Sequence, residues 1–133
     1  MIKKLLLSII VFFIFNTSTA QDIISEADVT VYKDSTVDIA PDFPGGTEAF
    51  YKFFLKEFKH PQVHSLIDKV VLSFIVEPDG TLSDIRIMHD AGFGTGEQAL
   101  EIMQTCPKWL PGSIKGKPVR VFHSIPIAVV TKD

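Results

Sequence analysis

The sequence has few of the residues on which disulfides, metal sites and nucleic-acid binding depend. Its single cysteine, Cys106, excludes a disulfide within the chain. The four histidines are scattered, so no set of converging zinc ligands is patterned. Thirteen basic residues against 16 acidic ones give a formal net charge of −3, and the basic residues do not cluster. We therefore predict no metal, no cofactor and no nucleic-acid partner.

Signatures of catalysis are also missing. The glycine-rich stretch 92–96 has neither the spacing nor the lysine of a phosphate-binding P-loop. Cys106 falls on an apolar helical face beside Pro107, whereas a cysteine nucleophile needs a positioned base and an accessible, electropositive setting. Its simpler interpretation is a small buried hydrophobic residue. We therefore predict that the protein is not an enzyme and has no catalytic residues.

A long apolar run occurs at the N-terminus, where Lys3 and Lys4 precede residues 5–15 and a small polar stretch ends at Ala20. As a helix this run rises only about 16 Å, well short of a hydrocarbon core of about 30 Å. The pattern favours a signal peptide over residues 1–20, cleaved after Ala20, and export to the periplasm. Retention of the segment as a membrane anchor is the alternative.

The rest of the chain divides into a lead and one domain. Residues 21–41 are rich in aspartate and alternate apolar residues around 29–32, which predicts a flexible acidic lead with one short strand as an option. Residues 42–133 have the size of one domain with one core.

Two helices are predicted in this domain. The run Phe43-Pro44-Gly45-Gly46 breaks the chain, Thr47 is placed to cap a helix, and the helix should span residues 48–58. A second helix is expected over residues 97–105. The apolar faces consist of Phe50, Phe53, Phe54 and Phe58 in the first helix and of Ala99, Ile102, Met103 and Cys106 in the second.

Three strands complete the predicted pattern. Residues 69–77 are nearly all apolar, as in a central strand, and a turn in which Gly80 takes positive φ leads to an antiparallel partner at 82–88. Residues 119–130 alternate in polarity and form the last strand. Pro126 cannot donate to a ladder, so we place this strand at the edge of the sheet.

Between the second helix and the last strand lies the only tryptophan. Pro107 and Pro111 flank Trp109, so the indole is presented from a stiff loop. We expect it to be buried against the core, with one partner for its N–H.

An edge strand of this length offers unpaired backbone groups to another strand. The alternative is plain sheet structure in which Pro126, Arg120 and Lys117 guard the edge. The residues alone leave both interpretations open.

With these elements in this order, residues 42–130 resemble the C-terminal domain of the TonB energy transducers. The residues that carry the resemblance are Phe43, Pro44, Gly45 and Gly46, the stretch 71–80, Ala99, Pro107, Lys108, Trp109, Pro111 and Gly112, and Gly116, Lys117, Pro118 and Val119. The resemblance implies an α+β fold in which two helices pack on one face of a small antiparallel sheet. The first strand of the hairpin is then central.

Proteins of this family work in the Gram-negative periplasm, between inner-membrane motor proteins and outer-membrane receptors. Their last strand pairs with a short segment of the receptor, so the resemblance carries this role to Val119, Val121, His123 and Ile125. The sequence departs from the family in having His60-Pro61 where a Tyr-Pro pair is common. It also lacks the usual long proline-rich spacer and, if residues 1–20 are cleaved, the anchor.

We therefore expect a periplasmic TonB-like module that pairs its last strand with an outer-membrane TonB-dependent receptor, linked to transmembrane nutrient transport. One alternative is an anchored energy transducer that retains residues 1–20 and contacts the motor proteins. The other is a structural module that binds an envelope protein or forms a homodimer through the edge strand.

Overall fold

The computed structural model describes residues 29–133, so the predicted signal peptide lies outside the described residues. Its elements are, in chain order, β1 (Val31–Lys33), the short 3-10 helix η1 (Asp34–Thr36), α2 (Thr47–Glu57), β2 (Ile67–Val76), β3 (Leu82–His89), α3 (Thr95–Gln104), β4 (Ser113–Ile114), β5 (Lys117–Pro118) and β6 (Arg120–Val130). The predicted helices and strands are all present. The β4–β5 hairpin was not expected.

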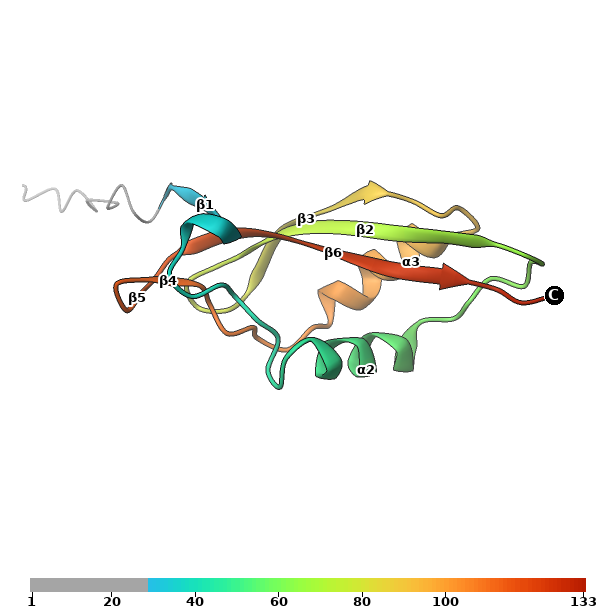
Figure 1. Cartoon of the computed structure of the whole chain (residues 1–133), viewed down its shortest axis with the longest axis horizontal. Coiled ribbons are helices and arrows are strands. Elements are labelled where there is room, and N and C mark those ends of the chain that lie inside the picture. The colour runs from blue at the N-terminus through green and yellow to red at the C-terminus, as the bar shows by residue number, and fades with distance from the viewer. Residues whose placement is uncertain (1–28) are drawn as a thin grey trace, which may run out of the picture.

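The main sheet has four strands in the order β1-β6-β2-β3. β2 pairs antiparallel with both β3 and β6, so the first strand of the hairpin is interior, as predicted. β1 pairs parallel with β6, which makes the sheet mixed rather than antiparallel. Both helices cover one face of the sheet (Figure 1), and the α+β class is confirmed.

The predicted edge position of the last strand needs one correction. β1 covers the first three residues of β6, with Tyr32 opposite Val121. The apolar stretch around residue 31 is too short to signal a pairing partner so far along the chain. Beyond residue 122, no strand among residues 29–133 pairs with β6 on this side.

The core fills the space between this sheet and the two helices. On α2, the predicted stripe is buried at Phe50 and Phe54 and continues past the helix end to Phe58, while Phe53 is partly buried. Each buried phenylalanine contributes about 1.5–3 kcal/mol, so the stripe holds α2 against the sheet. The strands contribute Val70, Leu72, Phe74 and Val76 from β2 and Val121, Ile125, Ile127 and Val129 from β6.

Both helices begin earlier than predicted. Gly46, with φ +88°, is the N-cap of α2, so Thr47 is the first helical residue and makes no capping bond. Gly45 also has positive φ, and a Cβ on it would lie only 2.9 Å from the Cβ of Ala49. At α3, Asp90 Oδ1 accepts the N–H groups of Gly92 (2.8 Å) and Gly96 (3.2 Å). The Asp90 carboxylate therefore orders the turn that starts α3 at residue 95.

Within the segment 21–41, the described residues form β1 and η1. Further hydrogen bonds tie this segment to the hairpin at the start of β6: the N–H groups of Asp38 and Ile39 donate to the Ser113 carbonyl at 3.0 and 3.1 Å. The Lys115 N–H donates to Asp38 Oδ2 at 2.6 Å.

Candidate functional site

The backbone N–H and C=O groups of successive β6 residues point alternately to the two sides of the strand. Just past the strand, the Thr131 N–H donates to the Leu66 carbonyl at 2.9 Å, and the pairing of β6 with β2 runs without a register shift. Because hydrogen-bonded pairs alternate along an antiparallel ladder, odd-numbered residues of β6 direct their backbone groups to β2. Even-numbered residues direct theirs to the opposite side.

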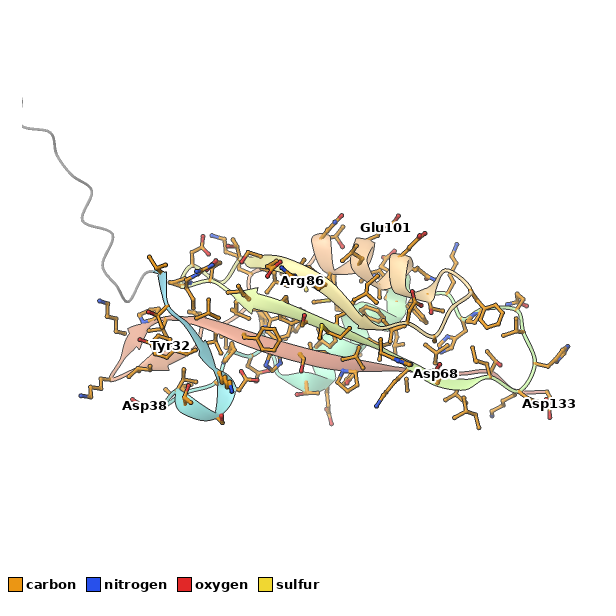
Figure 2. The ribbon with its side chains drawn as sticks, turned by 90° about the horizontal axis from the view of Figure 1, so that it is seen from above. Tyr32, Asp38, Asp68, Arg86, Glu101 and Asp133 are labelled. Atoms are coloured by element: carbon orange, nitrogen blue, oxygen red, sulfur yellow. The ribbon has the colours of Figure 1, made fainter. Side chains whose placement is uncertain are left out.

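The open edge consists of the even-numbered residues that β1 does not reach. Figure 2 shows β1, marked by Tyr32, along only one end of β6, on the side away from β3. The outward groups beyond it belong to Ser124, Pro126, Ala128 and Val130. The Tyr51 hydroxyl donates to the Pro126 carbonyl at 2.9 Å, as expected if this carbonyl points away from β2. Unpaired main-chain groups in this arrangement can accept another strand.

The four sequence-predicted binding residues, Val119, Val121, His123 and Ile125, are odd-numbered, whereas the backbone groups of the open edge belong to even-numbered residues. The side chains of Val119, Val121 and Ile125 are buried, and that of His123 is half-buried. From Val121 onward, their backbone groups face β2. These residues position the edge, while the intervening residues present the open groups. Partner binding at the four positions stays a prediction.

A side-chain contact between His123 and Asp34 marks the point where the open edge begins. His123 Nδ1 lies 2.7 Å from Asp34 Oδ2 of η1, and the imidazole packs against Phe74 and Trp109 with ring centroids 5.6 Å apart in each case. Asp34 and His123 are 89 residues apart in sequence, so no local pattern indicates their contact. The pair fastens η1 under β6 directly after β1.

Arg120 holds the other end of β1. Its Nε donates to Glu77 Oε1 at 2.5 Å, and its Nη1 donates to the Val29 carbonyl at 3.0 Å. The hydrogen bonds to Glu77 raise the pKa of Arg120. The sequence suggested Arg120 as one guard of the edge, but the structure places its guanidinium in an ion pair with Glu77, the residue after β2.

A cavity of about 160 Å³ lies beside the open edge. It is bounded by the loop before α2, the start of that helix, the Trp109 loop and one stretch of β6. The lining residues are Asp42, Phe43, Thr47, Phe50, Tyr51, Trp109, His123, Ser124, Ile125 and Pro126. Sequence reasoning identified Trp109 and the Phe43 loop separately, without indicating that they meet at the last strand.

The Trp109 side chain is buried as predicted. The indole is 4% exposed, and its Nε1–H donates to Cys106 Sγ at 3.3 Å. Burial raises the pKa of the Cys106 thiol, and the indole hydrogen bond opposes this rise. The neutral thiol is therefore favoured, which fits a packing role better than a nucleophilic one.

The motif residues that follow Trp109 lie in the segment that leads into β6. A Cβ on Gly112 would lie 2.6 Å from the Val121 side chain, and the Gly112 carbonyl accepts the Val119 N–H at 3.0 Å. Gly116, with φ +77°, forms the turn of the β4–β5 hairpin. Pro111 follows Leu110, which bridges to Asp42.

Pro44 lies in the turn before α2, which is closed by the Gly46 N–H donating to the Phe43 carbonyl at 2.7 Å.

Among residues 29–133, no group of three or more His, Cys, Asp or Glu side chains is arranged to hold a metal ion. Nor is any helix in this part of the chain long and apolar enough to cross a membrane.

Residues 66–128 match the family model for the Gram-negative bacterial TonB protein C-terminal. This segment belongs to the TonB C-terminal family. The match confirms the family that the sequence motifs indicated, and it runs from the start of β2 through most of β6. It includes the Trp109 loop and the four predicted binding residues, whereas α2 and the Phe43 loop precede it. Comparisons with curated proteins and with solved structures find no match.

The TonB C-terminal family consists of non-enzymatic energy-transducing and interaction domains of the Gram-negative envelope. In general these domains interact with outer-membrane TonB-dependent receptors. For residues 66–128, the match therefore supports a TonB-like role in energy transduction and receptor interaction in general.

Proposed function

We propose that this TonB C-terminal domain binds an extended segment of an outer-membrane TonB-dependent receptor, as a strand added to the open edge of β6. The binding is a step in transmembrane nutrient transport. The observation that carries the proposal is the row of outward backbone groups at Ser124, Ala128 and Val130, beside which no described strand lies. Main-chain hydrogen bonds to these groups supply affinity with little dependence on the side chains of the receptor.

β1 supports the proposal because it is already a strand added to the same edge. It pairs parallel with residues 120–122, so the backbone of β6 accepts a neighbour on this side. The receptor segment continues along the edge from the Asp34–His123 pair. Pro126 lacks a donor, and the Tyr51 hydroxyl occupies its carbonyl, so binding relies on the groups on either side of Pro126.

Two proline substitutions test the edge. Ser124→Pro and Ala128→Pro each remove an outward N–H while leaving the donors to β2 in place. Ala128→Val is the matched control, because it keeps the N–H and suits a strand. By contrast, Val121→Pro removes a donor that β2 uses, so it reports on folding.

The assay is fluorescence anisotropy with labelled peptides that cover the periplasm-facing segments of the organism's TonB-dependent receptors. We expect one or more peptides to bind the unaltered domain and the Ala128→Val variant. The same peptides should bind each proline variant about 10-fold more weakly, because the lost hydrogen bond and the steric bulk of the proline ring both weaken binding. Urea unfolding confirms that the variants are folded. Folded proline variants that bind every peptide as tightly as the unaltered domain would contradict strand addition.

We further propose that the domain acts in the periplasm after cleavage of residues 1–20. The sequence of that segment supports cleavage, whereas a working transducer would retain it as an anchor. N-terminal sequencing of protein from fractionated envelopes separates the two. Full-length protein that resists salt extraction from the inner membrane would establish the anchored form and contradict cleavage.

The same open edge also suits pairing between two copies of this chain. Analytical ultracentrifugation of the unaltered domain and of Ala128→Pro tests this alternative. A dimer that the substitution dissociates would favour self-association as the use of the edge, and a monomer would favour the receptor.

A further inference from the structure

The cavity beside β6 borders the position of an added strand. Ser124 and Pro126 belong to the open edge and also line the cavity, and Tyr51 stands beside the edge with its hydroxyl on the Pro126 carbonyl. A neighbouring strand lies about 4.8 Å from β6, and its alternate side chains point toward the helices. A side chain that points this way from a strand opposite residues 123–126 therefore meets the cavity.

The size and walls of the cavity fit one large apolar side chain. Its volume of about 160 Å³ is close to that of an engineered cavity of about 150 Å³ that holds benzene. Three rings of the wall are buried and in mutual contact, with centroid distances of 5.6 Å (Phe43–Phe50), 5.7 Å (Phe43–Trp109) and 5.6 Å (Phe50–Trp109). A phenylalanine, leucine or methionine side chain buries its surface against them.

Charge limits what can lie next to that side chain. Asp42 is in the cavity wall and is exposed to solvent, and its Oδ1 accepts the Phe43 N–H at 2.8 Å. The imidazole in the wall already faces the carboxylate of Asp34. An acidic residue in the added segment would be repelled by Asp42, whereas a basic neighbour would complement it.

We propose that this cavity is a specificity pocket for the receptor segment, taking one large apolar side chain from an extended segment whose adjacent residues are neutral or basic. The proposal rests on the proposed function, because the side chain enters from the strand added to β6. It adds side-chain selection to an interaction otherwise made by the main chain.

The test uses seven-residue peptides, acetylated and amidated at their ends, with threonine and lysine around a central guest residue. The guests are phenylalanine, leucine, alanine and glutamate. In ¹⁵N spectra, the amides of Ser124 and Ala128 report strand addition, while the fluorescence of Trp109, the only tryptophan, reports the cavity. We expect the phenylalanine and leucine peptides to bind at least about 10-fold more tightly than the alanine peptide, and the glutamate peptide to bind most weakly.

A variant that fills the cavity provides the second measurement. Thr47→Phe places a ring at the cavity wall and should abolish the preference for phenylalanine over alanine, while Lys52→Phe on the exposed side of α2 should preserve it. If the amides of Ser124 and Ala128 shift equally with all four peptides and the four affinities agree, the proposed specificity pocket is refuted, while strand addition is supported. If no peptide shifts the edge amides, strand addition fails for these probes, and the pocket as a subsite of an added strand fails with it.

Discussion

Replacing Gly80 with alanine should destabilise the domain by more than a backbone effect alone. Gly80 has φ +85°, and a Cβ on it would lie 2.2 Å from the Trp109 carbonyl oxygen. The same two residues are joined by a backbone hydrogen bond, in which the Trp109 N–H donates to the Gly80 carbonyl at 2.9 Å. A methyl group at this position pushes the Trp109 loop away from the β2–β3 turn and breaks that hydrogen bond.

The expected loss follows from two contributions. A left-handed backbone costs a residue with a side chain about 1–2 kcal/mol, and the broken hydrogen bond costs about 0.5–1.5 kcal/mol. With partial displacement of the buried indole, Gly80→Ala should lower the free energy of unfolding by about 2–4 kcal/mol. Gly92→Ala and Gly116→Ala are matched controls, because their φ values are +81° and +77° and a Cβ on either meets no atom within 4 Å. In each control, the free energy of unfolding should fall only by the cost of the left-handed backbone.

Urea unfolding followed by far-ultraviolet circular dichroism measures these differences without relying on the Trp109 signal. A difference of about 2 kcal/mol also corresponds to a melting temperature lower by about 8–16 °C in a domain of this size. If Gly80→Ala unfolds within about 0.5 kcal/mol of both controls, the close contact between Gly80 and Trp109 does not contribute as the structure indicates.

Three further predictions concern the core, the start of α3 and the thiol. Phe54→Ala should lower the free energy of unfolding by about 3–5 kcal/mol because Phe54 is fully buried, whereas Leu55→Ala, at a position 49% exposed, should change it far less; equal losses in urea would contradict this packing. Asp90→Ala should cost about 1–3 kcal/mol in thermal unfolding, since its carboxylate accepts the Gly92 N–H at 2.8 Å, and a neutral result would show that α3 does not need this cap. Burial raises the pKa of Cys106 above 9.0, so the folded state binds the thiol proton more tightly than the unfolded state does, and the free energy of unfolding should fall as pH rises above about 9. Cys106→Ala should remove this part of the pH dependence of stability. An unchanged pH dependence in Cys106→Ala would refute the prediction.

Local patterns were sufficient for the elements that form the core. The phenylalanines of α2 recur on one face, and the residues of β2 are apolar almost without interruption, so burial dictates both the type and the position of these elements. Helix starts were placed less well. At α2 the pattern favoured Thr47 as the cap because its hydroxyl can accept a backbone N–H, but Gly46 takes that position with a positive φ that glycine tolerates readily.

Contacts between distant segments were not predictable from local patterns. Nothing near Val31 or Asp34 indicates that β1 pairs with β6 or that Asp34 meets His123. The open edge illustrates the same limit. Alternation in β6 predicts which side chains face the core, but the side to which each backbone N–H points depends on the register with β2, revealed here by Thr131 and Leu66.

The candidate pocket and the core share residues, so the pocket is formed before any partner arrives. Phe43, Phe50 and Trp109 are buried in the core and also line the cavity, and Gly80 holds the Trp109 loop through a backbone hydrogen bond. A partner's side chain therefore meets rings that are already ordered, and binding loses little entropy on the domain side. It also follows that Gly80→Ala, chosen for stability, should weaken binding of the phenylalanine peptide more than binding of the alanine peptide, although Gly80 does not line the pocket.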